Sequence, residues 1–427
     1  MAVAVAMMLG TCEGSSARAD GGTDAATAMR GGAGSCKMRA LPERVIGGYA
    51  NWGREEWLSS REKIVKAVED GVNVILWFTI DLVDDEEAGS PVVRSRGPDG
   101  SFLSSISKEL QARGLHTTHL ITIGGWNEVH PTTRHAPDKV YAAWKKWNEQ
   151  EIARPDEGFL GFDGFDWDIE GNDDVSSKYN TFDVKTLDWI GRISQLAKQD
   201  GYIVSMAPCE SYLDPTSHSF DRSLTTTHSE WQPIVPHFTY HGKNAYAYIV
   251  SRYGFTKIED QGSEGVHVHY VHTFDMIMIQ LYESYSHANF ELTLNDKHPV
   301  QWLTEVIQRF SDGWLVQFSS DESVGYSDAI VKVLPSQLVL GLANAWAQPC
   351  GNPPCKTLFL HPHVLEKDWR SSPILSQIKG FAFWTIRHEG DPIIVGEDRQ
   401  ARFFMAAELN KLVGIRGNES AGDAATG

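Results

Sequence analysis

Eight short runs of aliphatic, β-branched and aromatic residues recur along the chain, and segments with the apolar period of an amphipathic helix lie between them. Strands that alternate with helices are typical of a parallel sheet covered by those helices. Eight such strands close a (β/α)8 TIM barrel, and we therefore predict this α/β fold. The predicted strands are 44–49, 74–80, 118–123, 164–169, 202–207, 276–280, 338–342 and 380–385.

Composition divides the 427-residue chain into one folded body and two ends. Residues 20–41 and 416–427 are rich in small and polar residues, and such segments bury too little apolar surface to order themselves. We therefore expect a disordered linker and a disordered tail on either side of one domain over residues 42–415. A (β/α)8 barrel routinely takes about 250 residues or more as one unit, so the length fits a single domain.

The first residues have the pattern of a secretory signal. An apolar stretch from Ala2 to Leu9 precedes the small-residue site Ala17-Arg18-Ala19. We predict a signal peptide over residues 1–19, and hence secretion; a disordered Ala-rich start is the alternative, because no Lys or Arg precedes the apolar stretch. The sequence contains no run of about 18 apolar residues, so we predict no transmembrane helix.

The formal net charge of −18 at pH 7 argues against two classes of partner. Nucleic acids and anionic membrane surfaces are bound through clusters of Lys and Arg, which this acidic chain lacks. The chain has 14 Trp residues, so some rings can contact a ligand while others pack in the core. These features favour a neutral or cationic ligand, and the rings are a first indication of sugar binding.

Cysteine usage agrees with an oxidising compartment. If Cys12 leaves with the signal peptide, an even number of cysteines remains, which permits two disulfide bridges. Two of them flank a Gly-Asn-Pro-Pro turn that can close a small disulfide loop. The four remaining cysteines are Cys36, Cys209, Cys350 and Cys355.

One connection between predicted strands is much longer than the others. About 65 residues separate Ala207 from Met276, and we expect them to form an extended loop insertion over the active face. This segment contains His267, His269 and His272. Alternating histidines can bind metal, but no Cys or carboxylate at ligand spacing completes a site, so we predict solvated histidines and no metal.

Three carboxylates on the fourth predicted strand form the most informative pattern. Asp166, Asp168 and Glu170 are spaced by two, and this spacing places all three on one face of a strand. The residues between them are bulky and apolar: Phe165, Trp167 and Ile169. Because these apolar residues must face the helix layer, the carboxylates must face the barrel interior, with Glu170 nearest the carboxyl-terminal rim where barrel enzymes react.

Buried, mutually repelling carboxylates bind protons more tightly than exposed ones. A carboxylic acid that stays protonated near neutral pH is what glycoside hydrolysis needs to protonate the leaving oxygen, and we assign that role to Glu170. A solvated edge strand or a Ca²⁺ site is the alternative, although acidic Ca²⁺ loops carry Gly and Asn rather than bulky apolar spacers.

The segment from Asp163 to Glu170 resembles the Asp-Gly-x-Asp-x-Asp-x-Glu motif of the family 18 glycoside hydrolases, the chitinase family. Thr122 to Trp126 is similar to the family's third-strand Ser-x-Gly-Gly, with Thr in place of Ser. Further matches follow in order along the chain: Val45 to Tyr49, Met206 to Pro208, Gln280 to Tyr282, and Phe383-Trp384. The resemblance covers roughly residues 44–409 and implies a substrate-assisted retaining mechanism, in which the acetamido oxygen of the sugar attacks the anomeric carbon.

The resemblance also implies roles for five residues. Glu170 would act first as acid and then as base, while Asp168 would orient the acetamido group. Asp166 would adjust the proton affinity of Asp168. Tyr282 would donate to the acetamido oxygen, and Trp384 would form the apolar floor beneath the sugar at the point of cleavage.

Other residues are candidates for substrate contact. The matched strand motifs contribute Gly125, Met206 and Gln280. Aromatic residues just past strand ends are candidates for neighbouring sugar subsites, with core packing as the alternative: Trp52, Trp126, Tyr285 and Trp346.

The resemblance predicts a chitinase that acts on chitin or N-acetylglucosamine oligosaccharides, without a cofactor and as a monomer. Only 37 residues separate Leu342 from Gly380, so the small domain that longer family members insert there is not expected. Without that inserted domain we expect a shallow cleft, which favours endo-type cleavage. An endo-β-N-acetylglucosaminidase acting on N-glycans and a catalytically silent chitin-binding lectin are the alternatives. Glu283 departs from the family's usual Asp or Asn, which puts fine substrate choice in doubt.

Overall fold

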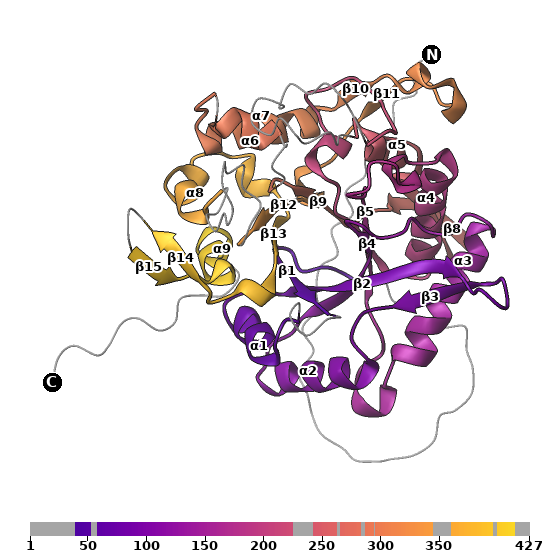
Figure 1. The fold of residues 1–427 in the computed structure, drawn as a ribbon, viewed down its shortest axis with the longest axis horizontal. Helices are drawn as coiled ribbons and strands as arrows, with labels where there is room; N and C mark the ends of the chain where they lie inside the picture. Colours follow the sequence, from indigo (N-terminus) through magenta and orange to yellow (C-terminus); the bar gives the residue numbers. More distant parts are fainter. Residues whose placement is uncertain are drawn as a thin grey trace. The chain divides into compact units, whose positions relative to one another are not determined.

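A computed structural model confirms the predicted barrel (Figure 1). It describes residues 39–52, 58–224, 242–262, 265–282, 287–293, 295–344, 360–395 and 399–414. The eight barrel strands are β1 (Val45–Asn51), β2 (Val74–Asp84), β4 (Thr118–Gly125), β5 (Gly164–Ile169), β6 (Ile203–Met206), β9 (Met276–Gln280), β12 (Leu338–Ala343) and β13 (Gly380–Trp384). They pair in parallel in the order β1-β13-β12-β9-β6-β5-β4-β2, and β1 also pairs with β2, which closes the sheet.

Helices surround the barrel, and short antiparallel strands decorate it. The helices are α1 (Arg61–Glu69), α2 (Gly100–Ala112), α3 (Pro137–Lys146), α4 (Val184–Gln199), α5 (Ala245–Tyr253), α6 (His287–Thr293), α7 (Pro299–Asp312), α8 (Pro362–Trp369) and α9 (Met405–Val413). Strand β3 (Pro91–Ser95) extends β2, and three two-stranded ribbons comprise β7 (Phe255–Gly262) with β8 (Gly265–His272), β10 (Trp314–Val316) with β11 (Ala329–Val331), and β14 (Pro392–Val395) with β15 (Arg399–Arg402).

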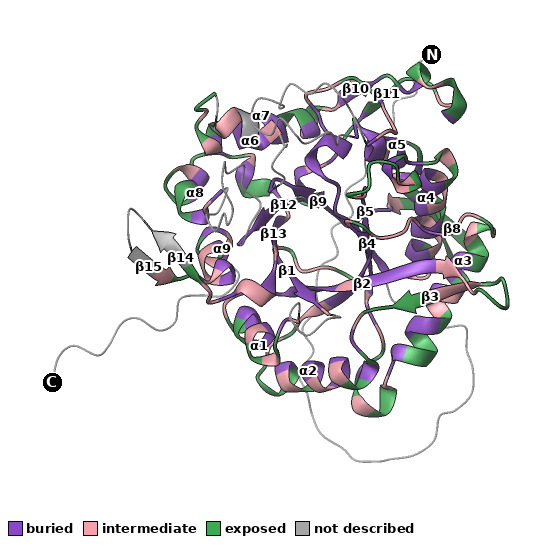
Figure 2. Cartoon of the chain, in the orientation of Figure 1, coloured by how far each residue is buried: buried purple, intermediate pink, exposed green. Residues whose placement is uncertain are grey.

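Local sequence explains why the helices begin where they do and which face they bury. Asp183 caps α4 by accepting a hydrogen bond from the Lys185 backbone, and Ser60 accepts one from Lys63 at the start of α1. Helix α7 begins with Pro299, whose missing N–H costs nothing in the first turn. The apolar stripe of α7 is buried throughout: Trp302, Leu303, Val306, Ile307 and Phe310. Figure 2 shows the same arrangement, with buried faces of the helices turned toward the strands.

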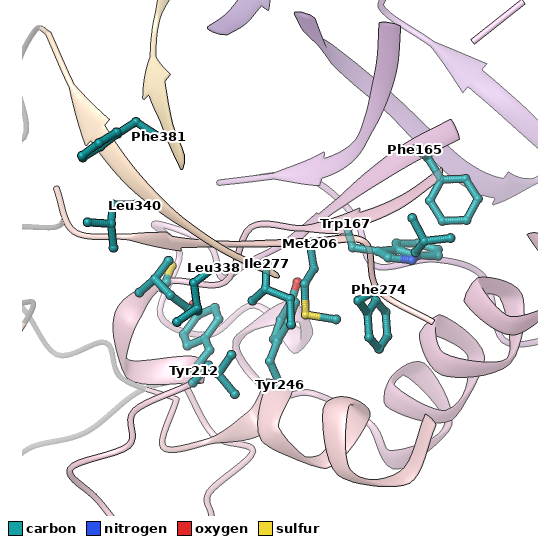
Figure 3. Close-up of a cluster of buried hydrophobic side chains, with 14 of the residues drawn as sticks. Phe165, Trp167, Met206, Tyr212, Tyr246, Phe274, Ile277, Leu338, Leu340 and Phe381 are labelled. Atoms are coloured by element: carbon teal, nitrogen blue, oxygen red, sulfur yellow. The ribbon is translucent and has the colours of Figure 1, made fainter. Parts of the chain in front are cut away.

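Side chains of the barrel strands alternate between two apolar layers. The interior layer includes Tyr49, Leu76 and Met278, whereas the layer between sheet and helices is larger and includes Phe165 and Trp167. Part of this outer layer is drawn in Figure 3, where Trp167 lies close to Met206 and Phe274. Alternation along each strand therefore decides which residues reach the barrel interior.

The long connection between β6 and β9 differs from our expectation. Its described part contains α5, which is the regular barrel helix after β6, and the β7–β8 hairpin. Gln195 and Gln199, in the last turns of α4, donate to the backbone carbonyls of Phe255 and Lys257 at 2.8 and 3.3 Å. Helix α4 returns from the carboxyl end of β5 to the amino end of β6, so the hairpin lies at the end opposite the active face. The prediction of a subdomain over that face is wrong for the hairpin, and residues 225–241 lie outside the described chain.

The hairpin carries the three histidines in exposed or half-buried positions. His269 Nδ1 lies 3.4 Å from Asp260 Oδ2, which is an ordinary surface pair. Within the described ranges, no group of three His, Cys, Asp or Glu side chains is arranged to hold a metal ion.

Several terminal and cysteine predictions fall on residues outside the described ranges. These are the signal peptide, most of the linker, the tail, and every cysteine except Cys209. Cys209 is buried, and because its three possible partners lie outside the described ranges, the two-bridge scheme stays a prediction. None of the described helices is long and apolar enough to cross a membrane.

Candidate active site

The three carboxylates of the β5 strand face the barrel interior, as the spacing predicts. Asp166, Asp168 and Glu170 are 0%, 6% and 7% exposed. Phe165 and Trp167 belong instead to the apolar layer under the helices. The bulky spacers therefore fix the strand in the orientation that turns all three acids inward.

Asp166 is the deepest of the three acids. The Tyr49 hydroxyl on β1 donates to Asp166 Oδ2 at 2.8 Å. Thr122 on β4 and Ser205 on β6 are its direct neighbours in the sheet register. Burial raises the pKa of Asp166 to about 6, and hydrogen bonds from Ser205 and Tyr49 oppose that rise. Tyr49 and Ser205 were not predicted as site residues, because a tyrosine in an apolar run and a strand serine give no distinctive signal.

Gln280, the last residue of β9, joins the two upper carboxylates. Its side-chain nitrogen donates to Asp168 Oδ1 at 2.9 Å, to Glu170 Oε1 at 2.6 Å and to the Ala207 carbonyl at 2.8 Å. These acceptors fix the amide orientation, since a rotated amide would direct its oxygen at three other oxygens. The Gln280 side chain therefore bridges Asp168 and Glu170.

Burial raises the pKa of Glu170, while hydrogen bonds from Asp168, Gln280 and Cys209 oppose that rise. The Cys209 thiol also lies 3.9 Å from Gln280 Oε1. Glu170 therefore has the main property of a general acid, a protonated form favoured by its surroundings.

Two residues that sequence reasoning missed hold the end of β5. The Tyr246 hydroxyl on α5 accepts from the Ile169 backbone N–H at 2.8 Å and donates to the Ile169 carbonyl at 3.1 Å. His130 Nε2 lies 3.0 Å from the Glu170 carbonyl and must donate, because a carbonyl only accepts. Burial lowers the pKa of His130 to about 4, so the imidazole is neutral at the pH values where most enzymes work.

The glycine pair at the end of β4 is required by close backbone packing. Gly124 and Gly125 have φ values of 97° and 119°. A Cβ on Gly125 would lie 2.4 Å from the Phe78 ring, and one on Gly124 would lie 2.7 Å from the Asp168 carbonyl oxygen. Gly124 therefore lets β4 pass close to the carboxylate strand, and Gly125 leaves room for the Phe78 ring; a substrate contact by Gly125 stays a prediction.

Aromatic side chains line the mouth of the barrel above the carboxylates. The Trp384 ring at the end of β13 lies 5.5 Å from the Tyr49 ring and 5.0 Å from the Phe78 ring, between ring centroids. Tyr282 and Ala343 form a small buried cluster against Trp384. The structure thus brings Tyr282 and Trp384 together at the open end of the barrel.

Two of the candidate subsite tryptophans have partners at the barrel rim. Trp52, directly after β1, packs on Phe102 with ring centroids 4.6 Å apart. Trp126, directly after β4, donates from Nε1 to Asp173 Oδ1 at 2.8 Å. Both rings are half-buried, so each keeps an accessible part at the rim. The other two candidates, Tyr285 and Trp346, lie outside the described residues, as does Glu283.

Met206 does not lie in the site. It is fully buried in the layer between sheet and helices (Figure 3). Its neighbour Ala207 belongs instead to the interior layer, and Ser205 lies beside Asp166 in the sheet register. Its prediction as a substrate contact is therefore wrong, because β6 turns alternate residues outward and Met206 falls on the outer face.

A cavity of about 470 Å³ lies on the flank of the barrel, between the ends of β2, β4 and the segment after β5. His130 forms part of its wall, but none of the three carboxylates does. Asp84 in its wall is engaged by Thr132 at 2.7 Å and by Arg134 at 3.4 Å. This cavity is therefore separate from the carboxylate cluster.

Comparisons with known proteins identify neither a family nor an activity for the chain. No family model matches the chain, and no curated protein matches it. Among solved structures, the chain is similar to catalytic domain 2 of the Ostrinia furnacalis Group II chitinase, with 10% identity, 88% and 98% of the two chains covered, and a TM-score of 0.45.

Two bacterial structures are similar to a comparable extent. The GH18 chitinase ChiB of Flavobacterium johnsoniae shows 13% identity, coverage of 87% and 93%, and a TM-score of 0.39. The Bacillus cereus spore cortex-lytic enzyme SleL shows 12% identity, coverage of 88% and 75%, and a TM-score of 0.43. Identities and scores this low do not transfer an activity, so a functional conclusion has to rest on the site itself.

Proposed function

We propose that the protein is a retaining glycoside hydrolase of the chitinase type, with Glu170 as general acid and base. The observation that carries this proposal is the arrangement of Asp168 and Glu170 under one shared donor, Gln280, in the interior of the barrel. A stable fold gains nothing from acids placed this way, whereas glycosidic cleavage needs a protonated acid beside a second carboxylate.

In the proposed reaction, Glu170 gives its proton to the glycosidic oxygen as the bond to the anomeric carbon breaks. The acetamido oxygen of the same sugar attacks that carbon, and Asp168 stabilises the positive charge that develops on the acetamido nitrogen. Glu170, now ionised, then takes a proton from a water that attacks the same carbon and displaces the acetamido oxygen, which restores the acetamido group. The two successive inversions retain the configuration at the anomeric carbon.

The aromatic mouth supports a sugar substrate. The apolar C–H face of a pyranose fits an aromatic ring, and Trp384 offers such a ring beside Tyr282 directly above the acids. Tyr282 would donate to the acetamido oxygen. Half-buried Trp52 and Trp126 at the rim are suited to neighbouring sugars of an oligosaccharide.

The proposal is tested with the purified protein and chito-oligosaccharides, with product anomers followed by NMR. We expect β-anomers from the wild type and none from Glu170→Gln, which should still bind. Asp163→Asn is the matched control, because Asp163 belongs to the same motif but accepts from the His119 backbone at the amino end of the strand. Cleavage of N-glycans instead of chito-oligosaccharides would reassign the protein as an endo-β-N-acetylglucosaminidase, and binding without any cleavage would reassign it as a lectin.

A further inference from the structure

Asn344 holds the backbone that carries Trp384. It follows the last residue of β12, and its own backbone N–H donates to the Trp384 carbonyl at 3.0 Å. Its side chain accepts from the Thr385 N–H at 2.8 Å and donates to the Thr385 carbonyl at 3.0 Å. Three hydrogen bonds from one residue therefore extend the β12–β13 pairing past the ends of the strands, at the position where Trp384 projects.

Glu389 connects this clamp to a helix. The second hydrogen on the Asn344 side-chain nitrogen points to Glu389 Oε1, at a nitrogen–oxygen distance of 3.1 Å. The same carboxyl group accepts from the backbone of Met405 at 2.9 Å and of Ala406 at 3.4 Å, in the first turn of α9. Both Asn344 and Glu389 are almost fully buried, so these hydrogen bonds do not compete with solvent.

The backbone of Trp384 and Thr385 is also held from the opposite side. The Thr385 hydroxyl donates to the Tyr49 carbonyl at 2.7 Å and to the Asn51 side chain, both on β1. The ring of Trp384 in turn packs against Tyr49. Loss of the hydrogen bonds made by Asn344 and Glu389 would shift the Trp384 ring relative to the carboxylates. It would not remove any group that touches a sugar.

We propose that Asn344 and Glu389 are positioning residues that set the orientation of Trp384 in the substrate site. This inference rests on the proposed function, because it requires that Trp384 contact the bound sugar. Neither residue touches the acids of the β5 strand in the described chain, so their effect should fall on binding rather than on proton transfer.

The chain offers a matched control at the other end of the barrel. Asn73 makes the same kind of clamp, since it accepts from the Ile46 N–H at 3.0 Å and donates to the Arg44 carbonyl at 2.7 Å. It is buried like Asn344 but lies at the amino end of β2. Asn73→Ala and Asn344→Ala should therefore cost similar stability, and only the second should disturb the substrate site.

The test measures binding of chitotetraose by calorimetry in the Glu170→Gln background, so that turnover does not enter. We expect Asn344→Ala and the isosteric Glu389→Gln to weaken binding about tenfold, a loss of about 1.4 kcal/mol, and Asn73→Ala to leave it unchanged. When the same two substitutions are made in the protein that retains Glu170, KM should rise by a similar factor while kcat changes less.

Each outcome has a distinct meaning. Equal affinity in all four proteins, with the melting temperature lowered equally by Asn73→Ala and Asn344→Ala, would overturn the positioning role. If Asn344→Ala fails to fold, Glu389→Gln decides the question, because it keeps the buried volume. Absence of chitotetraose binding in the parent protein would contradict the proposed function itself rather than this inference.

Discussion

Tyr49 donates a hydrogen bond of 2.8 Å to Asp166 across the interior of the barrel, and both residues are almost completely buried. This bond stabilises the ionised carboxylate, so its loss should raise the pKa of Asp166 above its value of about 6. We expect Tyr49→Phe to lower kcat about tenfold, which corresponds to the free energy of about one hydrogen bond to a charged group. The pH profile of kcat should also move to higher pH.

The matched control is Tyr141→Phe. Tyr141 donates to Asp200 at 2.7 Å in a pair outside the barrel interior. Its removal should change stability and leave the pH profile of kcat in place. A Tyr49→Phe profile that overlays the wild-type curve would show that Asp166 takes no part in setting the proton affinity of the site.

We expect Gln280 to contribute to kcat through its side-chain nitrogen, which donates hydrogen bonds. Gln280→Met keeps the length and bulk of the side chain but removes the nitrogen that donates to Asp168 and Glu170. The two acids then lose their shared donor, and kcat should fall about 100-fold, since a hydrogen bond to a charged group contributes about 1.5–3 kcal/mol. Steady-state kinetics at several pH values measure this, and a loss below threefold would argue against the bridging role.

Stability should fall as the pH rises from mildly acidic to alkaline. Burial raises the pKa of Glu389 to about 7 and of Asp166 to about 6, from ordinary values of 4.5 and 3.8. Between the unfolded and folded pKa values the folded protein holds protons that the unfolded chain has released, so each increase in pH favours unfolding until the folded pKa is passed.

For Glu389 alone the loss above pH 7 amounts to roughly 3 kcal/mol, at about 1.4 kcal/mol for each unit of pKa. Denaturant titrations at pH 5 and pH 8 measure the difference. Glu389→Gln removes the group and should flatten that part of the curve. The same slope in the wild type and in the variant would assign the pH dependence to other acids.

Gly125→Ala should destabilise the protein strongly and abolish activity. The added Cβ would meet the Phe78 ring at 2.4 Å, and the positive φ of 119° is unfavourable for alanine. Gly114→Ala isolates the second effect, because Gly114 has a φ of 70° and open space around its Cβ position. We expect about 1 kcal/mol from Gly114→Ala and several kcal/mol from Gly125→Ala in thermal unfolding. Equal losses would show that the Phe78 contact relaxes.

Much of the fold could be predicted from the chain because each barrel strand is a compact apolar run bounded by helical segments. All eight predicted strands overlap the observed ones. The sequence was less informative for β6, where Ser205 is the single polar residue. Met206 was taken as a substrate contact from its place in a matched motif, although the strand turns it toward the helices. The β7–β8 hairpin was misplaced because loop length does not say at which end of the barrel a loop lies.

The sequence by itself determined that Asp166, Asp168 and Glu170 share one face, because strand geometry has a period of two and the apolar spacers between them must be buried. Only the tertiary structure decided which groups meet those acids. Tyr49 is 117 residues away from Asp166 along the chain, and Gln280 is 112 residues away from Asp168. Closure of the sheet brings β1, β5 and β9 to one interior, and no local pattern records which side chains meet across it.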